Sequence, residues 1–153
     1  MRLNVADLYY IPNFQFDNGN IRDKYLIVLT DSVNDRLLLT LPTSVPGHLE
    51  KNQSGCISCE NSQFNCYRFL QGEVVTDEAT QFFFPLDTHL YGEWIGDWSA
   101  NALQLDYNVD GVDYEFKGQI KKEIFENILL CFIGSSKVKR KFKPRLQKIL
   151  DSL

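Results

Sequence analysis

The stretch that decides the fold runs from Asp7 to Ser44 and reads DLYYIPNFQFDNGNIRDKYLIVLTDSVNDRLLLTLPTS. Three segments in it have the length and composition of strands: 7–14, with a stop at Pro12, then 25–30 and 36–41. The turn at 16–20 contains Asn18-Gly19, a pair that tolerates the positive φ of a hairpin. The links are short, so we expect the three strands to pair antiparallel. The uninterrupted run YLIVLT predicts that strand 25–30 is buried on both faces.

The middle of the chain holds weaker strand patterns. A loop rich in Gly, Ser, Asn and Pro spans about 44–63 and interrupts the domain as an insertion. After it, a strand is expected at 64–70, strand or aromatic core at 81–85 and 88–91, and two further strands at 103–109 and 112–116. The last two segments flank Asp110-Gly111, which predicts a second hairpin.

The last third of the chain changes to a helical period. Large apolar residues recur every four positions from 120 to 132 and predict an amphipathic helix that ends at Gly134. A second helical segment follows, with Ser135 or Ser136 as the N-cap and with Pro144 either kinking it or starting a new helix. Strands first and helices last predict one α+β domain over residues 1–153, built on a small antiparallel sheet or barrel with a helical segment at about 119–152.

Composition excludes several classes of protein. The 153 residues are 44% hydrophobic and 24% charged, which is ordinary for a globular domain. No apolar run approaches the roughly 18 residues that span a bilayer. The first residues lack the apolar stretch of a signal peptide, so we expect a cytoplasmic protein whose four cysteines are reduced.

The net charge of −4 conceals a strong division along the chain. Met1–Arg68 has six basic and seven acidic residues, Phe69–Phe116 has ten acidic and no basic residues, and Lys117–Leu150 has ten basic and two acidic residues. Seven of the basic residues lie between Lys137 and Lys148. Two interpretations are open: a basic helix that neutralises the acidic segment, or a surface that binds phosphate groups.

The cysteines offer a candidate metal site. Cys56 and Cys59 form a C-x2-C pair, Cys66 follows, His48 precedes them, and Cys131 lies far away in the predicted helix. Thiolates and an imidazole can hold zinc, but the usual signature needs a second pair. We therefore predict no bound metal and no cofactor, and we expect Cys131 to pack as a small hydrophobic residue.

Other catalytic signatures are weak. The two histidines, His48 and His89, form no obvious pair, no nucleophile-elbow motif is present, and the glycines are scattered rather than gathered in a phosphate-binding loop. The aromatic residues of segment 82–98 have acidic neighbours in sequence, which favours a core role or a basic protein partner over stacking on nucleic acid.

Taken as a unit, the first 45 residues resemble the MazF/PemK (Kid/CcdB-like) toxin family. Those proteins typically open with Gly-Asp and a strand, continue through an Arg-Pro step into a second strand, and reach a third strand that ends in a threonine. Ala6-Asp7-Leu8 resembles the opening, 25–30 the strand after the Arg-Pro step, and Leu41-Pro42-Thr43-Ser44 the stretch with the threonine. Later segments follow the same order more loosely.

The resemblance implies an SH3-like barrel with helices, a homodimer, and an antitoxin protein that silences a metal-independent endoribonuclease of single-stranded RNA. The family threonine corresponds to Thr43. The family arginine corresponds to Lys24, with Tyr25 in place of the proline, and Arg22 lies two residues earlier. Because lysine lacks the bidentate fork of arginine, we expect Arg22 to substitute for the family arginine through the geometry of the loop. The alternative is an inactive barrel that binds protein or nucleic acid, in which these residues only flank a strand and a turn.

Overall fold

The hairpin predicted from the first stretch forms the centre of the fold. In the computed structural model, which describes residues 1–44, 53–59 and 64–153, β1 (Asp7–Gln15) pairs antiparallel with β2 (Ile21–Val28). Gly19 has a φ of 87° in the turn between them, as the Asn-Gly pair predicted. Pro12 does not end the strand; it lies in β1, where the register shifts between Ile11 and Phe14.

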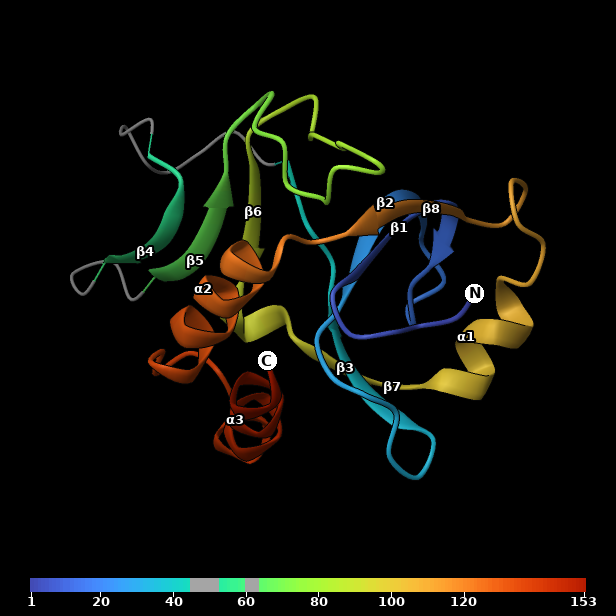
Figure 1. Cartoon of the computed structure of the whole chain (residues 1–153). Coiled ribbons are helices and arrows are strands. Elements are labelled where there is room, and N and C mark those ends of the chain that lie inside the picture. Colours follow the sequence, from blue (N-terminus) through green and yellow to red (C-terminus); the bar gives the residue numbers. More distant parts are fainter. Residues whose placement is uncertain (45–52, 60–63) are drawn as a thin grey trace.

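Two antiparallel sheets make up the β structure (Figure 1). The five-stranded sheet has the order β7-β3-β2-β1-β8, and the three-stranded sheet has the order β4-β5-β6. The remaining strands are β3 (Arg36–Thr40), β4 (Gly55–Cys59), β5 (Phe64–Phe69), β6 (Thr88–Tyr91), β7 (Gly96–Ser99) and β8 (Glu115–Gln119). The α+β class is confirmed. Within the described residues, however, edge strands β7 and β8 do not pair with each other, so the sheet does not close into the SH3-like barrel that we expected.

The described part of the chain also contains three α-helices: α1 (Ala100–Asp106), α2 (Lys122–Ile133) and α3 (Lys143–Ser152). Figure 1 shows α2 beside the three-stranded sheet, α3 below α2, and α1 at the far end of the five-stranded sheet. Two short 3₁₀ turns, η2 (Gly92–Trp94) and η3 (Arg140–Phe142), precede β7 and α3. Within the described residues, no helix combines the length and apolarity needed to cross a bilayer.

The core divides along the two faces of the five-stranded sheet. Leu26 and Val28 are buried on the face covered by α1, whereas Ile27 and Leu29 are buried on the face covered by α2 and α3. The prediction that this strand is buried on both faces is confirmed. The alternation follows from the period of two in a strand.

Three local predictions were wrong. Segment 103–109 contains the end of α1 rather than a strand, because Ser99 caps the helix and Leu103 and Tyr107 lie on one buried helical face. The predicted loop at about 44–63 contains β4. The second helix begins at Lys143 without a side-chain cap, so neither Ser135 nor Ser136 is its N-cap. Of the two alternatives for Pro144, the start of a new helix is confirmed, because Pro144 lies in the first turn of α3, where a proline needs no hydrogen-bonded N–H.

Candidate functional site

The candidate site lies where β2 and β3 separate. β1 accompanies β2 as far as Ile21, but β3 pairs with β2 only at Ile27 and Val28. The first part of β2 therefore has no β3 partner on that side. The chain after β3 turns away instead, toward the three-stranded sheet.

Thr43 is fixed at the junction of the two sheets. Its N–H donates to the carbonyl of His89 in β6 at 3.0 Å, and its carbonyl accepts the N–H of His89 at 2.8 Å. This two-way bridge places Thr43 opposite the unpaired part of β2. The side chain is buried, with 8% of the residue exposed.

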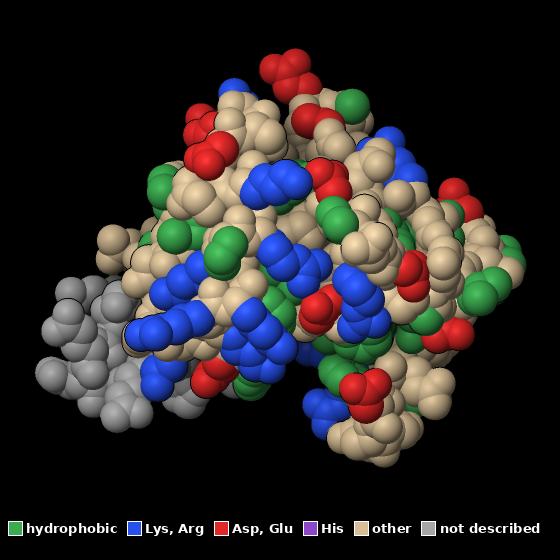
Figure 2. Space-filling model, turned by 90° about the horizontal axis from the view of Figure 1, so that it is seen from below, with side chains coloured by type: hydrophobic (Ala, Val, Ile, Leu, Met, Phe, Trp, Pro, Cys, Tyr) green, Lys and Arg blue, Asp and Glu red, His purple; other side chains and the backbone are tan. Residues whose placement is uncertain are grey.

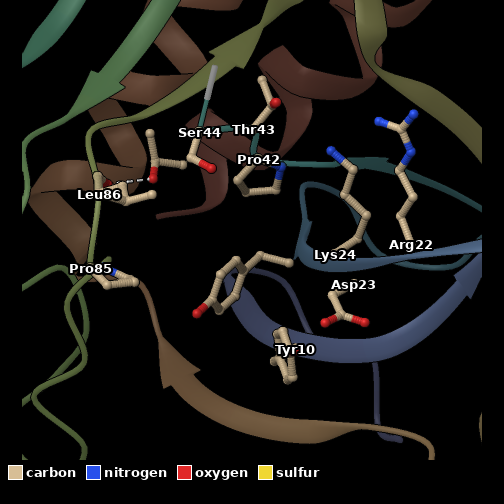
Figure 3. Close-up of a pocket in the computed structure, with 11 residues that line it drawn as sticks. Tyr10, Arg22, Asp23, Lys24, Pro42, Thr43, Ser44, Pro85 and Leu86 are labelled. Carbon is tan, nitrogen blue, oxygen red and sulfur yellow. Dashed lines mark hydrogen bonds between the residues drawn. The ribbon is translucent and has the colours of Figure 1, made fainter. Parts of the chain in front are cut away.

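Arg22, Lys24 and Thr43 together line two adjoining hollows with cavity volumes of about 340 and 450 Å³. In Figure 3, the side chains of Arg22 and Lys24 extend from the same side of β2, and the Lys24 amine points toward Pro42 and Thr43. Asp23, between them in sequence, points the other way, as strand alternation requires. The three residues singled out from the sequence thus surround one opening.

The electrostatics of the opening favour an anion. Partial burial, and then the neighbouring Arg22 cation, lower the pKa of the Lys24 ammonium below its ordinary value. None of the ion pairs between described residues involves Arg22 or Lys24. Two adjacent cations with no acidic partner in the described part of the chain form a site that a phosphate group would neutralise.

Tyr25, which stands where the toxin family has proline, has a structural role. Its ring packs edge-on against Phe84 with centroids 5.0 Å apart, and it also contacts Phe82 and Tyr10. This aromatic cluster anchors β2 next to Lys24. Tyr25 thereby holds the position of the cation through packing rather than through a rigid proline backbone.

Sequence reasoning missed several residues around the opening. Tyr10, Asp23, Ser44 and Leu86 line the smaller hollow, and burial followed by the Asp23 carboxylate raises the pKa of the Tyr10 phenol. Tyr10 was detectable in principle, because it pairs with Tyr25 in the register of the β1–β2 hairpin. The position of Ser44 and Leu86 depends on long-range pairing that no local pattern encodes.

Trp94 has acidic neighbours, as predicted, since Asp17 and Asp97 line one hollow with it, but cations also lie around it. It is 54% exposed and lines the larger hollow together with Arg22 and Lys24, so its neighbours in space include two cations despite its acidic neighbours in sequence. An exposed indole beside cations is the arrangement that stacks on single-stranded bases.

The cysteines and histidines differ from expectation. Cys56 in β4 forms a disulfide with Cys131 in α2, so neither is the reduced thiol that we predicted. His48 and the side chains of Cys59 and Cys66 lie outside the described residues. His89 is buried, and its Nε2 accepts a hydrogen bond from Nε of the buried Arg68 at 3.0 Å.

Comparison with known proteins identifies no family for this chain. The chain matches no protein-family model, no curated protein and no solved structure.

Proposed function

We propose that the protein is a metal-independent endoribonuclease that cleaves single-stranded RNA as the toxin of a toxin–antitoxin pair. The observation that carries the proposal is the convergence of Arg22, Lys24 and Thr43 on one opening at the junction of the sheets. The resemblance of residues 7–44 to the MazF/PemK toxins supports the same assignment for the same three positions.

The chemistry is transfer of the phosphate onto the neighbouring ribose. The RNA 2′-oxygen bonds to phosphorus as the bond to the 5′-oxygen breaks, which gives a 2′,3′-cyclic phosphate and a 5′-hydroxyl. The 2′-hydroxyl loses its proton to water, the leaving 5′-oxygen takes a proton from a cationic side chain, and water returns that proton to the side chain, so the step balances. Negative charge grows on the two non-bridging phosphate oxygens in the transition state, so fixed cations accelerate the reaction.

Each site residue has a defined role in this proposal. Arg22 binds the non-bridging oxygens through its planar fork. Lys24, whose pKa is lowered by burial and by Arg22, adds a second cation and protonates the leaving oxygen. The Thr43 hydroxyl, on a backbone held by His89, orients the phosphate by hydrogen bonding.

The test is cleavage in EDTA with analysis of the product ends. The purified protein should cut RNA and leave cyclic phosphate and 5′-hydroxyl ends. Arg22→Ala, Lys24→Ala and Thr43→Ala should each slow cleavage by about 100- to 1,000-fold, the range for loss of one transition-state contact. Lys122→Ala, at an exposed lysine of α2 that lines neither hollow, is the matched control. Intact RNA across many sequences at high protein concentration would contradict the proposal.

The burial of Thr43 favours a second candidate, a binding module that holds RNA or protein without cutting it. A hydroxyl with so little exposure has limited access to a reacting atom. This candidate predicts that Arg22→Ala and Lys24→Ala weaken binding of RNA that stays intact, whereas Thr43→Ala has no effect on binding.

We also propose a homodimer silenced by an antitoxin segment that occupies the opening. The homodimer is what the resemblance of residues 7–44 to the MazF/PemK toxins implies. Sedimentation equilibrium at micromolar protein and physiological salt should give twice the chain mass of 17.7 kDa. A measured mass equal to that of one chain at every protein concentration would contradict the proposed dimer.

A further inference from the structure

The end of the chain carries a row of cations that the proposed catalytic site does not use; all are exposed except Arg145, which is half-buried. We call this row the basic ridge and define it as Lys139, Arg140, Lys141, Arg145 and Lys148. All belong to η3, α3 or the residue before them. Figure 2, which views the molecule from below and so from the side of α3, shows lysine and arginine side chains gathered on this face.

The ridge faces outward because its apolar neighbours face inward. Phe142, Leu146 and Ile149 are buried against the core, with at most 5% of each residue exposed. Arg145 and Lys148 are three residues apart in α3, which places them along one side of that helix, and Lys141 precedes them in η3. The sequence therefore builds a cationic strip rather than scattered charges.

Arg145 joins the ridge to the five-stranded sheet. Its Nη1 donates to Asp97 Oδ2 at 3.0 Å, and Arg36 Nε donates to Asp97 Oδ1 at 3.1 Å. One carboxylate is thus shared by two arginines, which leaves a net positive charge at this junction. Among the ion pairs between described residues, only this one includes a member of the ridge. Neutralisation of the acidic segment by the terminal helix is therefore limited to Asp97.

A continuous surface leads from this junction to the candidate site. Arg36 and Asp97 line a hollow of about 490 Å³ with Leu41, Trp94 and Trp98. Leu41 and Trp94 also line the hollow that contains Arg22, Lys24 and Thr43. The order along the surface is therefore the two cations of the site, the exposed indole of Trp94, the Arg36–Asp97–Arg145 junction, and the ridge.

We propose that the basic ridge binds the flank of a single-stranded RNA whose scissile phosphate lies at Arg22, Lys24 and Thr43; the inference rests on the proposed ribonuclease function. Cations at both ends of the path match phosphates, and the exposed indole between them matches an unpaired base, which is how proteins hold single strands. Tyr91 packs against the Trp94 ring with centroids 4.7 Å apart, and the rest of the indole is exposed. An acidic protein segment would match the cations but has no base to stack on that exposed part of the indole.

The inference predicts dependence on RNA length. We expect a trinucleotide to occupy the opening alone and a strand of about 12 nucleotides to pass Trp94 toward the ridge, since single-strand sites commonly span about 4–16 nucleotides. Neutralising two ridge cations should remove two phosphate contacts, which lowers the slope of log affinity against log salt by about 1.4 and the affinity at 0.15 M salt by about tenfold. The short strand should bind unchanged.

The experiment measures fluorescence anisotropy with 2′-O-methyl RNA, which the protein cannot cleave by the proposed route. Full-length wild type is compared with Lys141→Gln/Lys148→Gln and with Lys121→Gln/Lys122→Gln, which loses the same charge at the start of α2. We expect only the ridge variant to bind the 12-mer with about tenfold lower affinity, and we expect its affinity for the trinucleotide to be unchanged. Trp94→Ala should weaken the 12-mer as well.

Several results would overturn the inference. Equal losses in the ridge and control variants would mean a general charge effect. An unchanged 12-mer affinity in the ridge variant, together with lost binding of a polyglutamate peptide, would assign the ridge to an acidic protein instead. This test can be separated from the test of the proposed function. If the protein does not cleave RNA but binds the 12-mer through the ridge, the ribonuclease proposal is wrong and the proposed RNA-binding surface stands.

Discussion

Breaking the disulfide between Cys56 and Cys131 should lower the free energy of unfolding by several kcal/mol. The bond closes a loop between residues 75 apart in sequence and ties β4 to α2, which is the last long helix before the basic ridge. In the chain-entropy model, a cross-link over a loop of that length restricts the unfolded chain by about 4 kcal/mol. That is a large part of the 5–15 kcal/mol typical of a domain.

The assay is urea unfolding with and without reductant. With a slope of about 2 kcal/mol per molar urea, the reduced protein should unfold at a midpoint about 2 M lower. The double variant Cys56→Ser/Cys131→Ala should match the reduced wild type and should not respond to reductant. A wild-type midpoint that reductant leaves in place would refute the bond and the anchoring of β4 that depends on it.

Three further predictions concern other groups. The cleavage rate should fall as the pH rises through the pKa of Lys24, because its ammonium is the active form; since that pKa is lowered, the fall should begin below the ordinary value of 10.5, and Lys24→Arg should move it to higher pH. An unmoved alkaline limb in the arginine variant would contradict this role. Asp7→Asn should lower the free energy of unfolding by about 1–3 kcal/mol in urea, because the fully buried carboxylate accepts hydrogen bonds from Arg2, Asn4 and Tyr9; an unchanged midpoint would argue against that network. Elemental analysis of protein purified without added metal should show much less than one zinc per chain, since Cys56 is in a disulfide; stoichiometric zinc that Cys59→Ser removes would contradict this.

Local patterns predicted the central hairpin and the long helix well. Asn18-Gly19 fixed the β1–β2 turn, and the four-residue spacing of apolar residues fixed α2 up to Gly134. Both features depend on residues close in sequence. The α1 segment was misread because Leu103 and Leu105 alternate like a strand, while the decisive signals were the Ser99 cap and the buried pair Leu103 and Tyr107.

Features that depend on contacts between residues far apart in sequence were not predicted. The backbone bridge between Thr43 and His89 joins residues far apart in sequence. It links two separate sheets, so the strands do not form the single barrel that was predicted. The disulfide likewise joins Cys56 to a cysteine that looked like ordinary helix core. The cationic pair in β2 was accessible to sequence reasoning, because alternation puts Arg22 and Lys24 on one face. The approach of Trp94 to that pair was not, since it depends on how β6 and η2 return to the sheet.

The measurement that tests the central claim most directly is single-turnover cleavage of a random pool of single-stranded RNA in EDTA. The wild type is compared with the variant Arg22→Gln/Lys24→Gln/Thr43→Val prepared in parallel. We predict that the wild type produces 2′,3′-cyclic phosphate ends and that the triple variant produces none above the background of RNA alone. Intact RNA with the wild type, or equal cleavage by the triple variant, would contradict the assignment of these three residues as a ribonuclease site.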